Sequence, residues 1–138
     1  MYEPWIVKKI QWGVFMENKK KILIADDDRD FVAVLQTRLE HEGYDVFYAY
    51  EGFRVIEIAH KERPDLIVLD WKMPAGKGDS VMESLAKRED TNKIPVIIIT
   101  GVGDQAVEEK VMHLGAKYFV RKPLDAKDFL EKIKNAIL

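Results

Sequence analysis

Cysteine is absent from the 138-residue chain. This excludes disulfide bonds, a thiolate nucleophile and cysteine-ligated zinc, and it suits a reducing compartment. No apolar run approaches the ~20 residues of a membrane span, and the N-terminus lacks the small-residue cleavage site of a signal peptide. Basic charge is not in excess, because 22 Lys and Arg stand against 24 Asp and Glu. Since nucleic-acid-binding domains usually carry a basic face, we expect a cytoplasmic protein that binds neither nucleic acid directly nor membranes.

Short apolar runs alternate with amphipathic stretches through residues 21–138. Most of the runs do not alternate with polar residues, which is typical of strands covered on both faces. The runs are Ile22–Ala25, Val46–Ala49, Leu66–Leu69, Val96–Ile99 and Tyr118–Val120. Between them, apolar residues recur at helical spacing, as Phe31, Leu35 and Leu39 do.

Residues typical of helix ends lie between the runs. Gly43 and Gly115 each precede a strand and predict where helices stop. Asp104 and Asp125 predict where the last two helices start. Strand–helix units in series imply an α/β fold with a parallel sheet and right-handed crossovers. The chain is too short for a (β/α)₈ barrel, so we predict an open, doubly wound, five-stranded parallel sheet.

Polar residues directly follow four of the predicted strands. In open α/β sheets this carboxyl edge is where ligands bind. Carboxylates follow the first and third strands, a hydroxyl the fourth and an ammonium the fifth; the residues are Asp26, Asp27, Asp28, Asp70, Thr100 and Lys122. Grouped carboxylates repel unless a cation lies among them, and oxygen ligands suit Mg²⁺. A carboxylate can also attack phosphorus to form an aspartyl phosphate.

Each of these residues has a simpler interpretation when taken alone. An aspartate after a strand is more often a helix cap or a turn former than a ligand. Lone lysines are usually solvated, and threonine is common at strand ends. Their joint occurrence at the correct strand ends in one chain favours a functional site.

Four segments together resemble the receiver domains of response regulators in two-component signalling. Lys21–Asp27 resembles the first strand with its acidic pair, and Asp70–Pro74, with Gly78, resembles the phosphorylation-site loop. Ile99–Gly101 resembles the fourth strand with its switch hydroxyl, and Phe119–Pro123 the fifth strand with its aromatic switch, lysine and proline. The resemblance covers residues 21–138 and leaves residues 1–20 as an N-terminal extension of uncertain status. It implies a flavodoxin-like fold with strand order 2-1-3-4-5.

By this resemblance, Asp70 would accept a phosphoryl group from a sensor histidine kinase or a phosphotransfer protein. Mg²⁺ would be bound directly by Asp27, by Asp70 and by the backbone carbonyl of Lys72, with Asp26 acting through water. The chain would then catalyse only its own phosphorylation and dephosphorylation, and would signal to a downstream protein target.

The resemblance also assigns the response to phosphorylation. Lys122, joined to Pro123 by a cis peptide bond, would contact one phosphoryl oxygen, and Thr100 would shift to donate to another. Phe119 would move inward behind Thr100, repacking the face formed by the fourth helix, the fifth strand and the fifth helix. The fifth strand opens with Ala116-Lys117-Tyr118 and lacks the acidic pair of the family's DNA-binding winged-helix branch. We therefore expect a monomer, or a weak dimer through that face.

Several alternatives stay open. The chain is either a stand-alone receiver or a receiver fragment of a larger regulator. A phosphatase of the haloacid dehalogenase type would need a carboxylate two residues after Asp70, where Lys72 stands. A flavodoxin-like electron carrier would need a hydroxyl- and glycine-rich loop after the first strand, where Asp26-Asp27-Asp28 stands. A degenerate receiver would bind partners without being phosphorylated. The complete set of acidic residues argues against this alternative.

Overall fold

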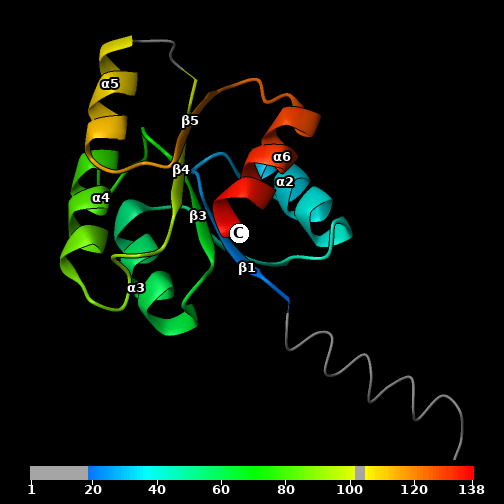
Figure 1. Cartoon of the computed structure of the whole chain (residues 1–138), viewed down its shortest axis with the longest axis horizontal. Coiled ribbons are helices and arrows are strands. Elements are labelled where there is room, and N and C mark those ends of the chain that lie inside the picture. Colours follow the sequence, from blue (N-terminus) through cyan, green and yellow to red (C-terminus); the bar gives the residue numbers. More distant parts are fainter. Residues whose placement is uncertain (1–18, 102–104) are drawn as a thin grey trace, which may run out of the picture.

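The computed structural model describes residues 19–101 and 105–138. Five parallel strands alternate with helices in an α/β fold (Figure 1). The strands are β1 (Lys21–Ala25), β2 (Asp45–Ala49), β3 (Leu66–Asp70), β4 (Val96–Thr100) and β5 (Tyr118–Arg121). The helices are α2 (Arg29–His41), α3 (Gly52–Glu62), α4 (Gly78–Lys87), α5 (Gln105–His113) and α6 (Ala126–Ile137). The strand order is β2-β1-β3-β4-β5, so the predicted doubly wound sheet is confirmed.

Helices cover both faces of the sheet (Figure 1). Helices α3, α4 and α5 lie on one side, and α2 and α6 lie on the other. Alternate residues of the central strands point to opposite faces, so Leu23 and Ile98 pack toward the first layer whereas Ile24 and Ile97 pack toward the second. Strands β3 and β4 are buried along their whole length. Their apolar runs show no alternation because both faces of these strands are covered.

The two edge strands are less covered than their apolar runs predicted. Tyr48 in β2 is 46% exposed, and every residue of Tyr118–Val120 in β5 is only partly buried. Within the part of the chain that the structure describes, strands β2 and β5 each pair with a single neighbour. An apolar run identifies a strand well, but it does not say whether the strand lies at the centre of the sheet or at its edge.

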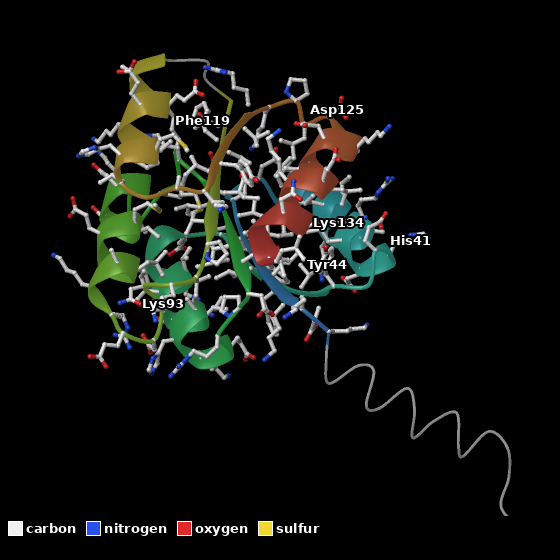
Figure 2. All side chains as sticks on the ribbon, viewed as in Figure 1. His41, Tyr44, Lys93, Phe119, Asp125 and Lys134 are labelled. Atoms are coloured by element: carbon white, nitrogen blue, oxygen red, sulfur yellow. The ribbon has the colours of Figure 1, made fainter. Side chains whose placement is uncertain are left out.

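The predicted helix ends are confirmed where the structure describes them. Asp125 caps α6, since its carboxylate accepts hydrogen bonds from the backbone N–H groups of Lys127 and Asp128 (Figure 2). Gly43 and Gly115 follow α2 and α5 with φ of 96° and 104°, a conformation that glycine adopts without steric cost. The helix start predicted at Asp104 lies outside the described residues. Across those residues, no helix combines the length and the apolar character that crossing a bilayer requires.

A charged cluster joins α3 to the loop before β4. Asp90 accepts hydrogen bonds from Arg88, at 3.1 Å, and from the ring nitrogen Nδ1 of His60. Arg63 adds a second guanidinium, 3.6 Å from Asp90. The Arg88 hydrogen bond, followed by that of His60, holds the pKa of Asp90 at about 2. The cluster lies at the amino ends of the strands, away from the edge where the site was predicted.

This cluster predicts an acid-sensitive contribution to stability. The folded-state pKa of Asp90 lies below its ordinary value of 3.8. The contribution is therefore present above about pH 4 and is lost as the pH falls toward about 2. We expect Asp90→Asn to lower the urea midpoint at pH 6 and to flatten its decline between pH 4 and pH 2. Asp45→Asn, on an exposed position of β2, is the control, and equal acid profiles for Asp90→Asn and the parent would contradict this assignment.

Candidate acidic functional site

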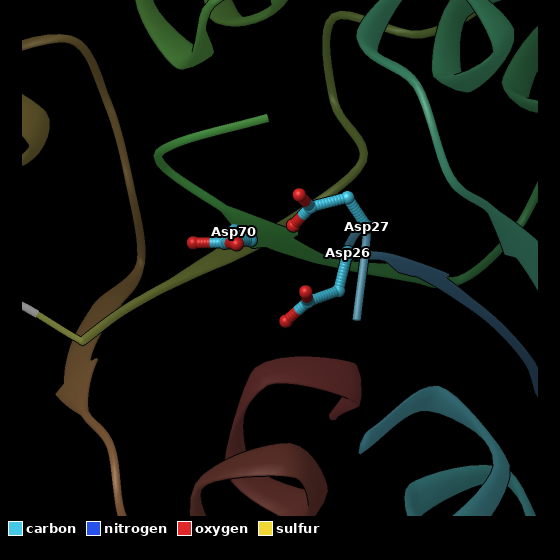
Figure 3. A group of neighbouring side chains, drawn as sticks. All are labelled: Asp26, Asp27 and Asp70. Carbon is cyan, nitrogen blue, oxygen red and sulfur yellow. The ribbon is translucent and has the colours of Figure 1, made fainter. Parts of the chain in front are cut away.

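Three carboxylates meet at the carboxyl edge of the sheet (Figure 3). Asp26 and Asp27 follow β1, and Asp70 is the last residue of β3. Strands β1 and β3 are hydrogen-bonded neighbours, so residues far apart in the sequence come together. One carboxylate oxygen from each of the three lies within 4.8 Å of the others. The predicted grouping of these side chains is thus found in the structure. Asp28, the third member of the acidic run, instead caps α2 by accepting from the Phe31 N–H at 3.1 Å.

The three carboxylates differ in burial. Asp26 is 0% exposed and Asp70 is 6% exposed, whereas Asp27 is exposed. Burial, followed by the negative charge of Asp26, raises the pKa of Asp70 to about 6, against the opposing effect of the Lys72 N–H and the Lys122 charge. The Lys72 N–H donates to Asp70 Oδ1 at 3.3 Å, and the Asp28 N–H donates to Asp26 Oδ1 at 2.9 Å. Negative charge is therefore concentrated at a site that a cation would stabilise.

Lys122 reaches this site from the end of β5. Its ammonium donates to Asp26 Oδ2 at 2.7 Å and lies 4.2 Å from the centre of the Phe31 ring. Within the described residues, Lys122 forms its ion pair with Asp26 and none with Asp70. The peptide bond between Lys122 and Pro123 is cis, as predicted. The lysine thus belongs to the site, but it contacts a different carboxylate from the one expected to be phosphorylated.

Thr100 and Phe119 occupy the neighbouring strands. Thr100 ends β4, is 1% exposed, and its carbonyl accepts from the Lys122 N–H at 2.8 Å. Phe119 lies on β5 (Figure 2), where it is partly buried against the core under α3, α4 and α5. The guanidinium of Arg121 lies 5.2 Å from the centre of its ring. Thr100 therefore ends β4 and Phe119 lies on the adjacent strand β5, which are the strand positions that the sequence predicted for them.

The loop after Asp70 is fixed by two close backbone approaches. A Cβ added to Gly78 would lie 2.3 Å from the Trp71 ring, and one added to Gly52 would lie 2.2 Å from the Gly76 carbonyl oxygen. The carbonyls of Pro74 and Ala75 accept from the first two N–H groups of α3, at 3.1 and 2.9 Å. Sequence analysis identified Gly78 only by resemblance and missed Gly52, Gly76 and Phe31. Isolated glycines and a helical phenylalanine give no signal of a contact with a distant segment.

Comparison with known proteins agrees with this fold. Residues 22–134 match the family model described as the response regulator receiver domain. The chain belongs to this family. "Probable transcriptional regulator ycf27" of Cyanophora paradoxa is 38% identical over 120 residues, which are 87% of this chain and 49% of that protein. The ycf27 protein of Galdieria sulphuraria is 38% identical over 119 residues, 86% of this chain and 46% of its own. The chain thus spans about half the length of these curated relatives.

Solved structures show the same fold. A CheY-like receiver domain protein from Methanospirillum hungatei JF-1 is 29% identical with a TM-score of 0.81, over 87% of this chain and 94% of that one. The receiver domain of the sensor histidine kinase PA1611 from Pseudomonas aeruginosa PAO1 is 23% identical with a TM-score of 0.80, over 86% of this chain and 98% of that one. Its structure has a magnesium ion coordinated in the active-site cleft. The match to the receiver-domain family favours a receiver over the phosphatase and the electron carrier left open by the sequence.

Proposed function

We propose that this receiver domain is a phosphorylation switch in which Asp70 accepts the phosphoryl group. The family to which the chain belongs consists of the receiver domains of two-component response regulators. The observation that carries the assignment to Asp70 is its position as the buried carboxylate at the end of β3, beside Asp26, Asp27 and Lys122. The donor would be a sensor histidine kinase or a phosphotransfer protein, and the output a protein target.

The donor set fits Mg²⁺. Three carboxylates with oxygens within 4.8 Å of one another offer hard oxygen ligands and excess negative charge. Asp27 and Asp70 would bind the ion directly together with the Lys72 carbonyl, and Asp26 would act through water. Bound there, Mg²⁺ would neutralise negative charge on the acceptor carboxylate and on the phosphoryl group.

The protein's own groups account for the remainder of the transfer. A carboxylate oxygen of Asp70 forms the new bond to phosphorus, while the bond from phosphorus to the donor atom breaks and its electron pair leaves with the donor. Lys122 would move from Asp26 to a phosphoryl oxygen, and the Thr100 hydroxyl would donate to another. Phe119 would then move inward, changing the face formed by α5, β5 and α6. Such a change is a two-state response to a local charge.

Phosphorylation by a small donor tests this function directly. The parent chain is incubated with acetyl phosphate and Mg²⁺, and its intact mass is measured. We expect one phosphate added per chain, and none when EDTA replaces Mg²⁺. A chain that stays unmodified at saturating donor, while remaining folded by circular dichroism, would rule out the proposed function.

The direct-ligand assignment predicts unequal effects of the two neighbouring aspartates. Asp27→Ala should weaken Mg²⁺ binding by about tenfold more than Asp26→Ala, because loss of a direct ligand exceeds loss of an outer contact. Binding is followed through Trp71 fluorescence in a chain carrying Trp5→Phe and Trp12→Phe. Asp79→Ala, on α4, is the control and should bind as the parent does. Equal losses of Mg²⁺ affinity in Asp26→Ala and Asp27→Ala would contradict the assignment.

The wider setting follows from the same proposal. Residues 21–138 would form the receiver domain and residues 1–20 an extension to it. The protein would work in the cytoplasm as a monomer, or as a weak dimer through the face of α5, β5 and α6. It would act through protein contacts, without itself binding nucleic acid or membrane.

A further inference from the structure

The ammonium of Lys122 lies between two groups of different chemistry. On one side it donates to the buried Asp26 carboxylate at 2.7 Å, and on the other it faces the Phe31 ring with 4.2 Å to the ring centre. The side chain of Lys122 is 24% exposed. The ammonium therefore contacts both neighbours while most of the side chain is shielded from water.

The position of Phe31 is set by the start of α2. The Asp28 carboxylate accepts from the Phe31 N–H, which fixes the first turn of the helix. From there Phe31 packs partly buried against the core between the sheet, α2 and α6. It also lines a groove of about 540 Å³ whose other walls include Val34, Leu130 and Lys122. The ring therefore contacts apolar neighbours of the core as well as the lysine.

The aromatic ring favours one position of the neighbouring charge. The face of the ring carries partial negative charge and attracts an ammonium most strongly where water is excluded. Here that attraction adds to the ion pair with Asp26 and opposes movement of Lys122 toward Asp70. The two carboxylates are neighbours, since one oxygen of Asp26 lies within 4.8 Å of one oxygen of Asp70.

We propose that Phe31 is a positioning residue that holds the Lys122 ammonium beside Asp26 and restrains it from Asp70 until a phosphoryl group is present. The restraint exists in the unmodified protein, whereas its effect on phosphorylation rests on the function proposed above. A leucine at position 31 would keep the apolar packing of α2 but remove the ring face. A tyrosine would keep both.

The first test reads the contact in the unmodified protein, without Mg²⁺ or donor. An aromatic ring shifts the NMR signals of protons lying over its face upfield. We expect the Lys122 ε-methylene protons to be shifted upfield in the parent and in Phe31→Tyr, and to move to ordinary values in Phe31→Leu. Val34→Ala, which changes the same groove but leaves the Phe31 ring in place, should keep the parent shift. Ordinary shifts in the parent, or no change in Phe31→Leu, would overturn the proposal.

The second test measures the rate of phosphate incorporation from acetyl phosphate at fixed Mg²⁺. We expect Phe31→Leu to react about threefold faster, the scale of one partly exposed cation–π contact. Phe31→Tyr and Val34→Ala should react at the parent rate. An unchanged or slower Phe31→Leu would show that the ring does not restrain Lys122 from Asp70. If the parent takes up no phosphate, the proposed function fails, and the NMR shifts alone decide the role of Phe31.

Discussion

Replacing Asp70 with asparagine is expected to abolish phosphorylation by acetyl phosphate in the presence of Mg²⁺. The amide cannot supply the anionic oxygen that attacks phosphorus, while its size and the backbone hydrogen bond from Lys72 are retained. Burial and the charge of Asp26 raise the pKa of Asp70 to about 6, so loss of this carboxylate also removes a source of repulsion in the folded state. We therefore expect the variant to be at least as stable as the parent toward urea at pH 7.

Asp79→Asn is the matched control for this experiment. Asp79 is a nearby carboxylate on α4, paired with Lys110 at 3.5 Å, and should not accept phosphate. Intact mass measured over time should show the parent and Asp79→Asn gaining one phosphate at similar rates and Asp70→Asn gaining none. A full phosphate increment on Asp70→Asn would assign the acceptor to another residue.

The largest stability effect is expected from Gly52→Ala. The added methyl would lie 2.2 Å from the Gly76 carbonyl oxygen, which is backbone and cannot rotate away. Either α3 or the loop after Asp70 must shift, and the hydrogen bond from Gly52 to Pro74 would weaken. Overpacking of this kind typically costs about 1–3 kcal/mol. We expect a loss of about 3 kcal/mol in the free energy of unfolding.

Gly101→Ala is the comparison for that measurement. Among the described residues, nothing lies within 4 Å of the Cβ that would be added to Gly101. Its free energy of unfolding in urea should stay within about 1 kcal/mol of the parent, since a glycine-to-alanine change without a clash has a small effect. Equal stabilities of the two variants would show that the contact between α3 and the loop yields without cost.

The fold was predictable because its pattern is repeated in every unit of the chain. Apolar runs at Leu66–Leu69 and Val96–Ile99 identified the two strands that are buried throughout. Gly43, Gly115 and Asp125 located helix ends through backbone and capping preferences that act locally. The exposure of Tyr48 was not predictable in the same way. It depends on which strand lies at the edge, and that is a property of the assembled sheet.

The site was predictable in its membership but not in its pairing. The sequence places Asp26, Asp70 and Lys122 at strand ends, and parallel strands bring those ends together. It does not say which carboxylate the lysine contacts, because that depends on side-chain distances across several strands. The ring of Phe31 beside Lys122 was hidden for the same reason. Its helical spacing with Leu35 marked it as core, and it serves the core and the lysine together.

The contact between α3 and the loop after Asp70 gives the helix an unusual start. Glu51 provides no side-chain cap, and the carbonyls of Pro74 and Ala75 accept from the N–H groups of Gly52 and Phe53 instead. We therefore expect these two amide hydrogens to be protected from exchange with solvent by a different segment of the chain. We expect their exchange rates to follow the opening of the loop beside the acidic site, even when α3 itself stays folded. The first turn of α3 is consequently a natural reporter of motion next to Asp70.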